Sequence, residues 1–280
     1  MSFLKVLDES TLAVTEPRFY KIWLADQDPN DSQLERWVEL EAGHLRKGKN
    51  RVSNLKKFFS VEGKEVLDVG CQWGSVSIAL ARENAIVTGI DVKEAFVKGA
   101  GARAEDQGVK ATFLTSSAEK MPFPDNSFDV VIGLNIIEHV GSQSETVREM
   151  IRVLRPGGYL FIDGPNRFSP EMFKNDPHYQ LRAVSVFPNW LGRFYITKIR
   201  GFQSYEVGVF PTASKIERLL RKNCVEIVAA SRKKHKDSFI SRLKTYIKFN
   251  TSPKFFLVGE KMISDNRRID GVGRRYNEKC

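Results

Sequence analysis

Apolar residues in the first part of the chain recur at roughly helical spacing. Between residues 31 and 59 they stand at Leu34, Trp37, Val38, Leu40, Leu45, Val52, Leu55, Phe58 and Phe59. Repeats of three and four residues place such side chains on one face of a helix. The spacing is interrupted near Gly43 and Gly48. The pattern therefore predicts two helices before residue 60.

From residue 64 onward, short apolar runs alternate with longer amphipathic segments. Strands are predicted at 64–69, 86–91, 110–115, 128–133 and 158–163, and helices at 75–83, 93–106 and 143–154. The last of these helices is expected to stop at the breaker cluster 155–158, Arg-Pro-Gly-Gly, before the next strand begins. Alternation of this kind predicts an α/β fold with a doubly wound, parallel sheet. Its ligand is expected at the carboxyl ends of the strands.

The remainder of the chain has a different pattern. Residues 164–211 are rich in aromatic residues, Pro and Asn and have no clear period, which is typical of a substrate loop. A helix at 212–223 and strands at 224–230 and 254–260 are predicted to complete the fold. The expected division is an N-terminal helical cap over 1–60, the main domain over 61–262 and a disordered basic tail over 263–280.

The composition is that of an ordinary globular protein, with 41% hydrophobic and 28% charged residues in a chain of 280. No run approaches the roughly 18 consecutive apolar residues that a membrane helix needs. The mixed N-terminus does not resemble a signal peptide. The three cysteines, Cys71, Cys224 and Cys280, lack the spacing of a zinc site. These features predict a cytoplasmic protein without a bound metal.

The positive charge of the chain is concentrated at one end. Residues 213–280 hold 18 Lys and Arg against 7 Asp and Glu, and the whole chain has a net charge of +10. This asymmetry predicts an anionic partner or, alternatively, a solvated basic surface without a specific partner. Residues 236–249 have the pattern of a basic amphipathic helix with one apolar face. Such a helix either lies peripherally on an anionic membrane, here the inner face, or packs on the protein's own surface.

The segment Val66-Leu-Asp-Val-Gly-Cys-Gln-Trp-Gly74 joins a predicted strand to a predicted helix, and the second strand ends on an acid, Asp91. Glycines in such a turn let the backbone approach a ligand, and an acid at the end of the second strand accepts hydrogen bonds from ribose hydroxyls. Gln72 replaces the glycine that would admit a pyrophosphate, which argues against a nicotinamide dinucleotide. The spacing predicts a nucleoside ligand without phosphates, of which S-adenosylmethionine is the common example.

Four motifs in the same order resemble the class I S-adenosylmethionine-dependent methyltransferases, in the branch known as methyltransferase type 11. They are VLDVGCQWG at 66–74, GIDV at 89–92, SSAEKMPFPDNSFDVVIGLNIIEHV at 116–140 and EMIRVLRPGGYLFI at 149–162. The resemblance implies a seven-stranded, Rossmann-like sheet whose last strand is antiparallel, with the cofactor over the first four strand ends. It also implies that the protein is an enzyme of this class.

The resemblance assigns ten residues to the cofactor site: Asp68, Gly70, Cys71, Gly74, Asp91, Val92, Ser117, Ala118, Leu134 and Asn135. Asp68 is expected to order the loop near the methionine moiety, and Asp91 to bind both ribose hydroxyls. Ser117 stands where the family usually has aspartate, so the contact with the adenine amino group is expected to be weaker there. Leu134 is expected either to face the methionine moiety or to belong to the core.

Histidines supply the candidate bases. The resemblance places His139 near the transferred methyl group, where a histidine removes a proton from the acceptor. The alternative is a histidine at a helix start that only bonds the backbone. His178, in the 164–211 loop, is a second candidate base, and His44 is expected to be exposed rather than in the pocket.

The acceptor is predicted to be a small molecule, with a saccharide or a lipid-linked metabolite as the leading choice. Residues 164–170 and 176–179 resemble bacterial enzymes of cell-surface saccharide and lipid modification. An RNA methyltransferase is the alternative that the basic end allows, but residues 134–137 lack the motif of enzymes that methylate base amino groups. Nucleic acid is therefore not the expected partner. A catalytically silent, cofactor-binding fold is the third alternative.

Overall fold

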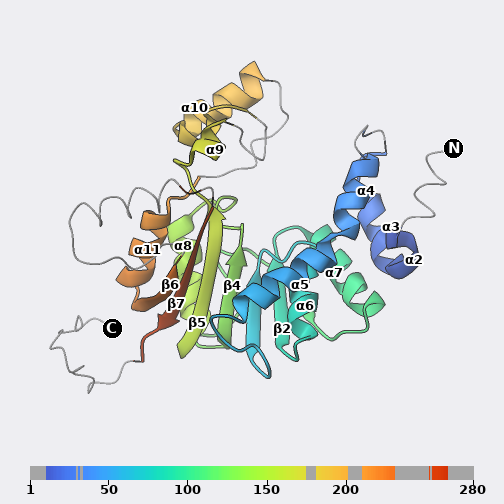
Figure 1. Ribbon diagram of the computed structural model, residues 1–280, viewed down its shortest axis with the longest axis horizontal. Helices are drawn as coiled ribbons and strands as arrows, with labels where there is room; N and C mark the ends of the chain where they lie inside the picture. The colour runs from blue at the N-terminus through green and yellow to red at the C-terminus, as the bar shows by residue number, and fades with distance from the viewer. Residues whose placement is uncertain are drawn as a thin grey trace. The chain divides into compact units, whose positions relative to one another are not determined.

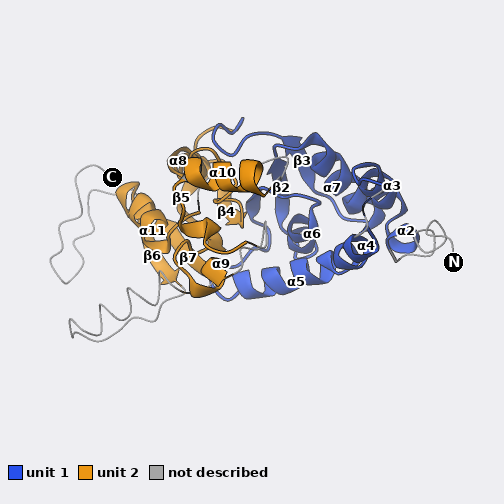
Figure 2. Cartoon of the chain, turned by 90° about the horizontal axis from the view of Figure 1, so that it is seen from above, with its two compact units in different colours: residues 1–122 blue, residues 123–280 orange. Residues whose placement is uncertain are grey.

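The computed structural model describes residues 11–29, 31, 34–174, 181–200, 210–230, 252 and 254–263 (Figure 1). The chain divides into two compact units, which we call unit 1, residues 1–122, and unit 2, residues 123–280 (Figure 2). In the part of the chain that the structure describes, no helix is both long enough and apolar enough to cross a bilayer.

The described elements of unit 1 begin with helices and continue as alternating strands and helices. They are α2 (Thr11–Thr15), α3 (Pro17–Ala25), α4 (Leu34–Ala42), α5 (His44–Leu55), β1 (Glu65–Val69), α6 (Ser75–Ala81), β2 (Ile86–Asp91), α7 (Glu94–Asp106) and β3 (Thr112–Thr115). The two helices predicted before residue 60 are α4 and α5. No separate helices were predicted over residues 11–25, where the structure has α2 and α3.

The described elements of unit 2 are β4 (Phe128–Leu134), α8 (Gln143–Val153), β5 (Leu154–Pro165), α9 (Pro170–Lys174), η1 (Val184–Val186), α10 (Asn189–Phe194), η2 (Tyr195–Ile199), α11 (Ala213–Lys222), β6 (Val225–Ala230) and β7 (Lys254–Lys261). Each strand and helix predicted over 128–230 and 254–260 corresponds to one of them, although β5 begins four residues before the predicted strand. The 164–211 segment, expected to be irregular, contains the short helices α9, η1, α10 and η2. The predicted helix at 236–249 lies outside the described residues.

The strands form a seven-stranded sheet in the order β3-β2-β1-β4-β5-β7-β6. β2 is parallel to β1 and β3, and β4 is parallel to β5. β7 is antiparallel to both β5 and β6. Four of the five residues of β1 are buried, as expected for a central strand covered on both faces. The predicted doubly wound fold, with seven strands and an antiparallel last strand, is confirmed.

Two predicted helix or strand boundaries were wrong, each at a glycine. α5 continues through Gly48, where a Cβ atom would lie 2.2 Å from the carbonyl oxygen of Ser75. Gly48 therefore allows α5 to pack closely against the start of α6 instead of ending the helix. The cluster at 155–158 ends α8 as expected, but it lies within β5, where Gly157 has a φ of +76°. A left-handed glycine lets the strand continue through the cluster.

Candidate functional site

The loop between β1 and α6 is held by hydrogen bonds to β2. The backbone amides of Gly70 and Cys71 donate to the carbonyl oxygen of Ile90, at 2.8 and 3.0 Å. Gly70 and Gly74 both have a φ of +76°. A left-handed backbone costs roughly 1–2 kcal/mol for a residue with a Cβ atom, so glycine suits both positions. The tight turn that the motif predicts is therefore present, and we call residues 70–74 the glycine loop.

Gly74 is also a point of close approach between the glycine loop and α7. A Cβ atom at this position would lie 2.9 Å from the Cβ atom of Ala100 and 3.3 Å from the ring of Phe113. Gly74 precedes the first turn of α6. The end of the loop consequently presents backbone, and not a side chain, to whatever the loop binds.

Asp91 ends β2 with its carboxylate directed at the glycine loop. One oxygen accepts a hydrogen bond from the Gln72 amide and the other from the Lys93 amide, each at 3.0 Å. A carboxylate has about four lone-pair sites, so each oxygen keeps the capacity to accept a ribose hydroxyl. The next residue, Val92, is apolar with 72% of its surface exposed. An open apolar side chain beside an acid that can still accept ribose hydroxyls suits an adenine ring.

Asp68 is buried next to the glycine loop, and its carboxylate accepts a 2.6 Å hydrogen bond from the Ser77 hydroxyl. Burial, with a contribution from the charge of Asp91, raises the pKa of Asp68 to about 6, although Ser77 and the Arg51 guanidinium act in the opposite direction. A buried carboxylate beside a second one favours a cationic ligand, because positive charge relieves the repulsion.

The Cys71 thiol, another expected cofactor contact, is buried. Burial raises its pKa, and the charges of Asp68 and Asp91 add to this effect. The thiol therefore stays neutral and has the character of a packing group rather than of a nucleophile.

Ser117 and Ala118 follow β3. The Ser116 amide donates to the carbonyl oxygen of Asp91 at 2.9 Å, which holds this segment beside the end of β2. The Ser117 hydroxyl accepts a 3.1 Å hydrogen bond from the Glu119 amide. The serine thus stabilises its own turn and keeps its hydroxyl proton for a ligand. The structure brings the segment close to Asp91, and its expected contact with adenine stays a prediction.

The remaining expected site residues belong to unit 2 or lie outside the described residues. Leu134 ends β4 and is half-buried. Asn135 has a φ of +50°, and its backbone amide donates a 2.7 Å hydrogen bond to the Asp163 carboxylate. His139 is exposed, and its amide donates to the Ile136 carbonyl at 2.9 Å. The roles expected of all three stay predictions. His178 lies outside the described residues.

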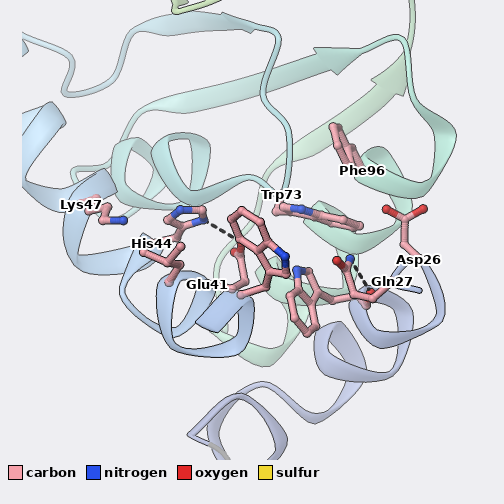
Figure 3. Close-up of a pocket in the computed structure, with 10 residues that line it drawn as sticks. Asp26, Gln27, Glu41, His44, Lys47, Trp73 and Phe96 are labelled. Atoms are coloured by element: carbon pink, nitrogen blue, oxygen red, sulfur yellow. Dashed lines mark hydrogen bonds and ion pairs between the residues drawn. The ribbon is translucent and has the colours of Figure 1, made fainter. Parts of the chain in front are cut away.

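Unit 1 contains a cavity that the sequence did not predict (Figure 3). It has a volume of about 310 Å³ and is lined by Trp23, Asp26, Gln27, Trp37, Leu40, Glu41, His44, Lys47, Trp73 and Phe96. His44, expected to be exposed, keeps only 35% of its side chain exposed. Trp73 connects the cavity to the glycine loop. A sequence signal that could have indicated it is the bulky Trp73 in a turn that begins and ends with glycine.

Glu41 also belongs to a buried ion cluster. The fully buried guanidinium of Arg103, from α7, lies 2.9 Å from Glu16 and 2.6 Å from Glu41. The second carboxylate oxygen of Glu41 lies 2.7 Å from Nδ1 of His44. Burial alone would raise the pKa of Glu41, but the hydrogen bond with His44 and the charge of Arg103 outweigh burial and lower it. Among the described side chains, no group of three His, Cys, Asp or Glu is placed to hold a metal ion.

A comparison with known protein families identifies the segment that contains the glycine loop. Residues 67–162, from β1 to β5, match the family model described as a methyltransferase domain. Residues 67–162 therefore form a methyltransferase domain, and the sheet that contains them has the class I fold. The seven strands and the antiparallel last strand described above are those that the resemblance of the four motifs implied.

The methyltransferase domain has relatives of known name. Ubiquinone biosynthesis O-methyltransferase of Coxiella burnetii is 32% identical over 117 residues, which are 42% of this chain and 50% of that protein. The protein of the same name from Pseudomonas entomophila is 34% identical over 168 residues, 58% of this chain and 65% of that one. The chain thus spans about half the length of the curated relatives it matches.

A solved structure shares the fold of the methyltransferase domain. The crystal structure of magnesium protoporphyrin IX methyltransferase from Synechocystis, with bound SAH, covers 92% of this chain and 98% of its own, with a TM-score of 0.53 and 19% identity. An identity this low shows the fold alone.

S-adenosylmethionine is the cofactor of this class of methyltransferase domain, and the residues of the glycine loop fit it. The backbone at Gly70 and Gly74 is open to a ligand, and Asp91 retains acceptor capacity for two ribose hydroxyls. The sulfonium and ammonium groups of the cofactor carry the positive charge that Asp68 and Asp91 favour. The acceptor oxygens and the negative charge at the glycine loop therefore suit S-adenosylmethionine.

Proposed function

We propose that the whole protein is a methyltransferase that transfers the methyl group of S-adenosylmethionine to an oxygen atom of a small-molecule acceptor. The observation that carries the proposal is the glycine loop with Asp68 and Asp91 beside it, where burial and, to a smaller extent, the charge of Asp91 raise the pKa of Asp68. An oxygen acceptor is supported by the two relatives, both named O-methyltransferases. Within that class, a saccharide or a lipid-linked metabolite remains the predicted acceptor.

The protein's contribution to such a reaction is positioning. When bound, S-adenosylmethionine supplies a methyl group already activated by its sulfonium. Asp91 fixes the ribose through both carboxylate oxygens, and Val92 offers an apolar surface to the adenine. The backbone of the glycine loop fixes the methionine end. Orientation of this kind, with exclusion of water, supplies most of the rate enhancement when the leaving group needs no activation. His139 as the base remains a prediction.

Calorimetry with S-adenosylmethionine tests the proposed cofactor site. Asp91→Asn is expected to weaken binding roughly 10- to 100-fold, because the amide keeps one acceptor oxygen and turns an N–H₂ group toward a backbone donor or a ribose hydroxyl. Glu94→Gln is the matched control, since Glu94 is three residues away, fully exposed and paired with Lys98. It should bind the cofactor as tightly as the parent.

Two results of the calorimetry would contradict the proposal. If the Asp91→Asn variant binds the cofactor as tightly as the parent, Asp91 does not hold the ribose. A parent protein that shows no binding at millimolar cofactor would favour the catalytically silent alternative. The RNA methyltransferase alternative makes a separate prediction, an RNA affinity that falls steeply with salt concentration.

A peripheral contact with an anionic membrane is a second part of the proposed function. The helix predicted for it, 236–249, lies outside the described residues. In unit 2, however, α10 and η2 leave Trp190, Phe194 and Ile199 exposed by 72%, 52% and 61%. The same segment carries Arg193 and Lys198 and has no acid. Exposed aromatic residues beside basic ones are typical of segments that bind a membrane interface.

Co-sedimentation with vesicles of phosphatidylglycerol tests this contact. The double variant Trp190→Ser, Phe194→Ser is expected to lose roughly tenfold in vesicle affinity, because two interfacial side chains no longer insert. Val14→Ser, which removes an equally exposed apolar side chain from α2 in unit 1, is the control and should bind like the parent. Equal losses in the double variant and in the control would refute a specific contact through α10 and η2.

A further inference from the structure

The fully buried Arg103 has no part in the proposed methyl transfer, yet its guanidinium joins three parts of unit 1. It donates to both carboxylate oxygens of Glu16, at 2.9 and 3.0 Å, and to one oxygen of Glu41 at 2.6 Å. The nitrogen that contacts Glu41 also donates to the backbone carbonyl of Trp73, at 3.4 Å. A single buried cation of α7 therefore connects the residue that precedes α3, the last turn of α4 and the glycine loop.

Aromatic rings make the same connection beside the guanidinium. The guanidinium carbon of Arg103 lies 3.6 Å from the centroid of the Phe19 ring, in α3. That ring packs edge-on against Trp73, with ring centroids 5.7 Å apart, and both rings are buried. On the α7 side, a Cβ atom at Gly99 would lie 2.4 Å from the Trp73 indole. Because packed side chains leave little free space, a displacement of α3 is transmitted to Trp73 and so to the glycine loop.

α3 has a second attachment to α7, which does not reach the glycine loop. One carboxylate oxygen of Asp106 accepts hydrogen bonds from the backbone amides of Arg18 and Phe19, at 2.8 and 2.9 Å. These amides belong to the first turn of α3, so Asp106 caps that helix from α7. Within the described part of the chain, Asp106 has no hydrogen bond or ion pair with residues 70–74. Asp106 thus anchors α3 alone, whereas Arg103 anchors α3 and also holds the loop.

We propose that Arg103 is a positioning residue that couples the docking of α3 and α4 to the binding of S-adenosylmethionine at the glycine loop. The inference rests on the proposed function, because the cofactor has to occupy this loop. Docked helices hold Glu16 and Glu41 against the guanidinium, and the guanidinium holds the Trp73 carbonyl. A loop that is already ordered loses less conformational entropy when the ligand binds. Because coupling between two sites is reciprocal, bound cofactor should stabilise the docked helices by the same factor.

Calorimetry with S-adenosylmethionine measures the effect of Arg103 on the cofactor site. Arg103→Lys keeps the buried positive charge, but a single ammonium group does not span the two carboxylates and the Trp73 carbonyl. The variant is expected to bind the cofactor at least about fivefold more weakly than the parent. Asp106→Ala is the matched control from the same helix, since α3 loses its cap but keeps Arg103, and its cofactor affinity should stay within about twofold of the parent. Circular dichroism checks that both variants are folded.

Hydrogen exchange followed by mass spectrometry tests the reverse direction of the coupling. In the parent, saturating cofactor is expected to slow the exchange of amides in α3 and α4 at least about fivefold. In Arg103→Lys this slowing should be lost in α3 and α4, while bound cofactor still protects the amides of the glycine loop. The measurement on the parent does not depend on the folding of any variant.

The same exchange measurement without cofactor reports the order of the glycine loop itself. Residues 70–74 are expected to exchange at least about fivefold faster in Arg103→Lys than in the parent, and at the parent's rate in Asp106→Ala. A protein whose loop follows this pattern but which binds no cofactor would refute only the proposed function.

Three results would overturn the inference. The first is a parent with bound cofactor whose α3 and α4 amides exchange as fast as without it. The second is an Arg103→Lys variant that equals the parent in cofactor affinity and in loop exchange. The third is an equal change in Arg103→Lys and Asp106→Ala, which would make Arg103 an anchor of α3 alone. A protein that binds the cofactor and gives any of these results leaves the proposed function intact.

Discussion

Replacing Gly74 by alanine is expected to lower the free energy of unfolding of unit 1 by about 2–5 kcal/mol. The left-handed backbone, with a φ of +76°, costs roughly 1–2 kcal/mol for alanine. The new Cβ atom would also lie 2.9 Å from the Cβ atom of Ala100, and crowding of a packed site adds roughly 1–3 kcal/mol. Because the glycine loop must shift to relieve this contact, S-adenosylmethionine should bind at least about tenfold more weakly.

Gly63→Ala is the matched control for this experiment. Gly63 also has a left-handed backbone, with a φ of +66°, but no atom lies within 4 Å of the position that its Cβ atom would occupy. The variant should therefore lose only the backbone contribution of roughly 1–2 kcal/mol and bind the cofactor normally. Urea unfolding followed by circular dichroism, with cofactor calorimetry, measures both variants. Equal losses of stability and equal cofactor affinities would show that the loop is not packed as described.

Replacing Arg103 by methionine is expected to destabilise unit 1 by about 3–5 kcal/mol near neutral pH. Arg103 is fully buried, and its removal leaves Glu16 and Glu41 buried without their counter-charge. Breaking a buried ion pair on one side costs roughly this amount, because desolvation of the remaining charge is no longer offset. Thermal or urea unfolding measures the loss.

The effect of pH distinguishes a buried charge from lost packing. In the parent, the pKa of Glu41 is below its usual value of 4.5, so its stabilising contribution is present above about pH 4.5 and is lost as the pH falls through the lowered pKa. Without Arg103, burial dominates and raises that pKa. The folded variant then binds a proton more readily than the unfolded chain, and its stability deficit should shrink as the pH falls from about 7 to about 5.

Two further variants serve as controls for the ion cluster. Lys98→Met removes an exposed cation of α7 that pairs with the equally exposed Glu94 and should change stability by less than about 1 kcal/mol. Adding Glu16→Leu to Arg103→Met should recover part of the lost stability, because one buried charge disappears. A deficit in Arg103→Met that is independent of pH, and that Glu16→Leu does not reduce, would contradict the assignment of a buried charge cluster.

The geometry of the glycine loop was predictable from the sequence because its determinants are local. Gly70 and Gly74 mark a turn that only glycine enters without strain, and Asp91 follows at the end of the next apolar run. The structure shows the Asp91 carboxylate bonded to the Gln72 amide of that same turn. The alternation of strands and helices also predicted the parallel strands, because the hydrophobic period of each element extends over only a few residues.

The cavity of unit 1 was not predictable from the sequence. His44 was expected to be exposed, and nothing in the periodicity of residues 31–59 indicates that its ring meets Glu41 beside Trp73. Gly48 was interpreted as a helix break, although its close contact with Ser75 is what sets the distance between α5 and α6. A hydropathy pattern records which face of a helix is apolar, but it does not record what that face contacts.

The sequence by itself determined the order of the strands and helices, the glycine loop and the acid that ends the second strand, because turn chemistry and hydrophobic period act between residues close in the chain. Only the tertiary structure decided which distant charges meet. Arg103 and Glu16 are 87 residues apart in the chain, and each alone has the appearance of an ordinary surface residue. They became a buried cluster because α3, α4 and α7 pack together, and packing brings together side chains that no local pattern connects.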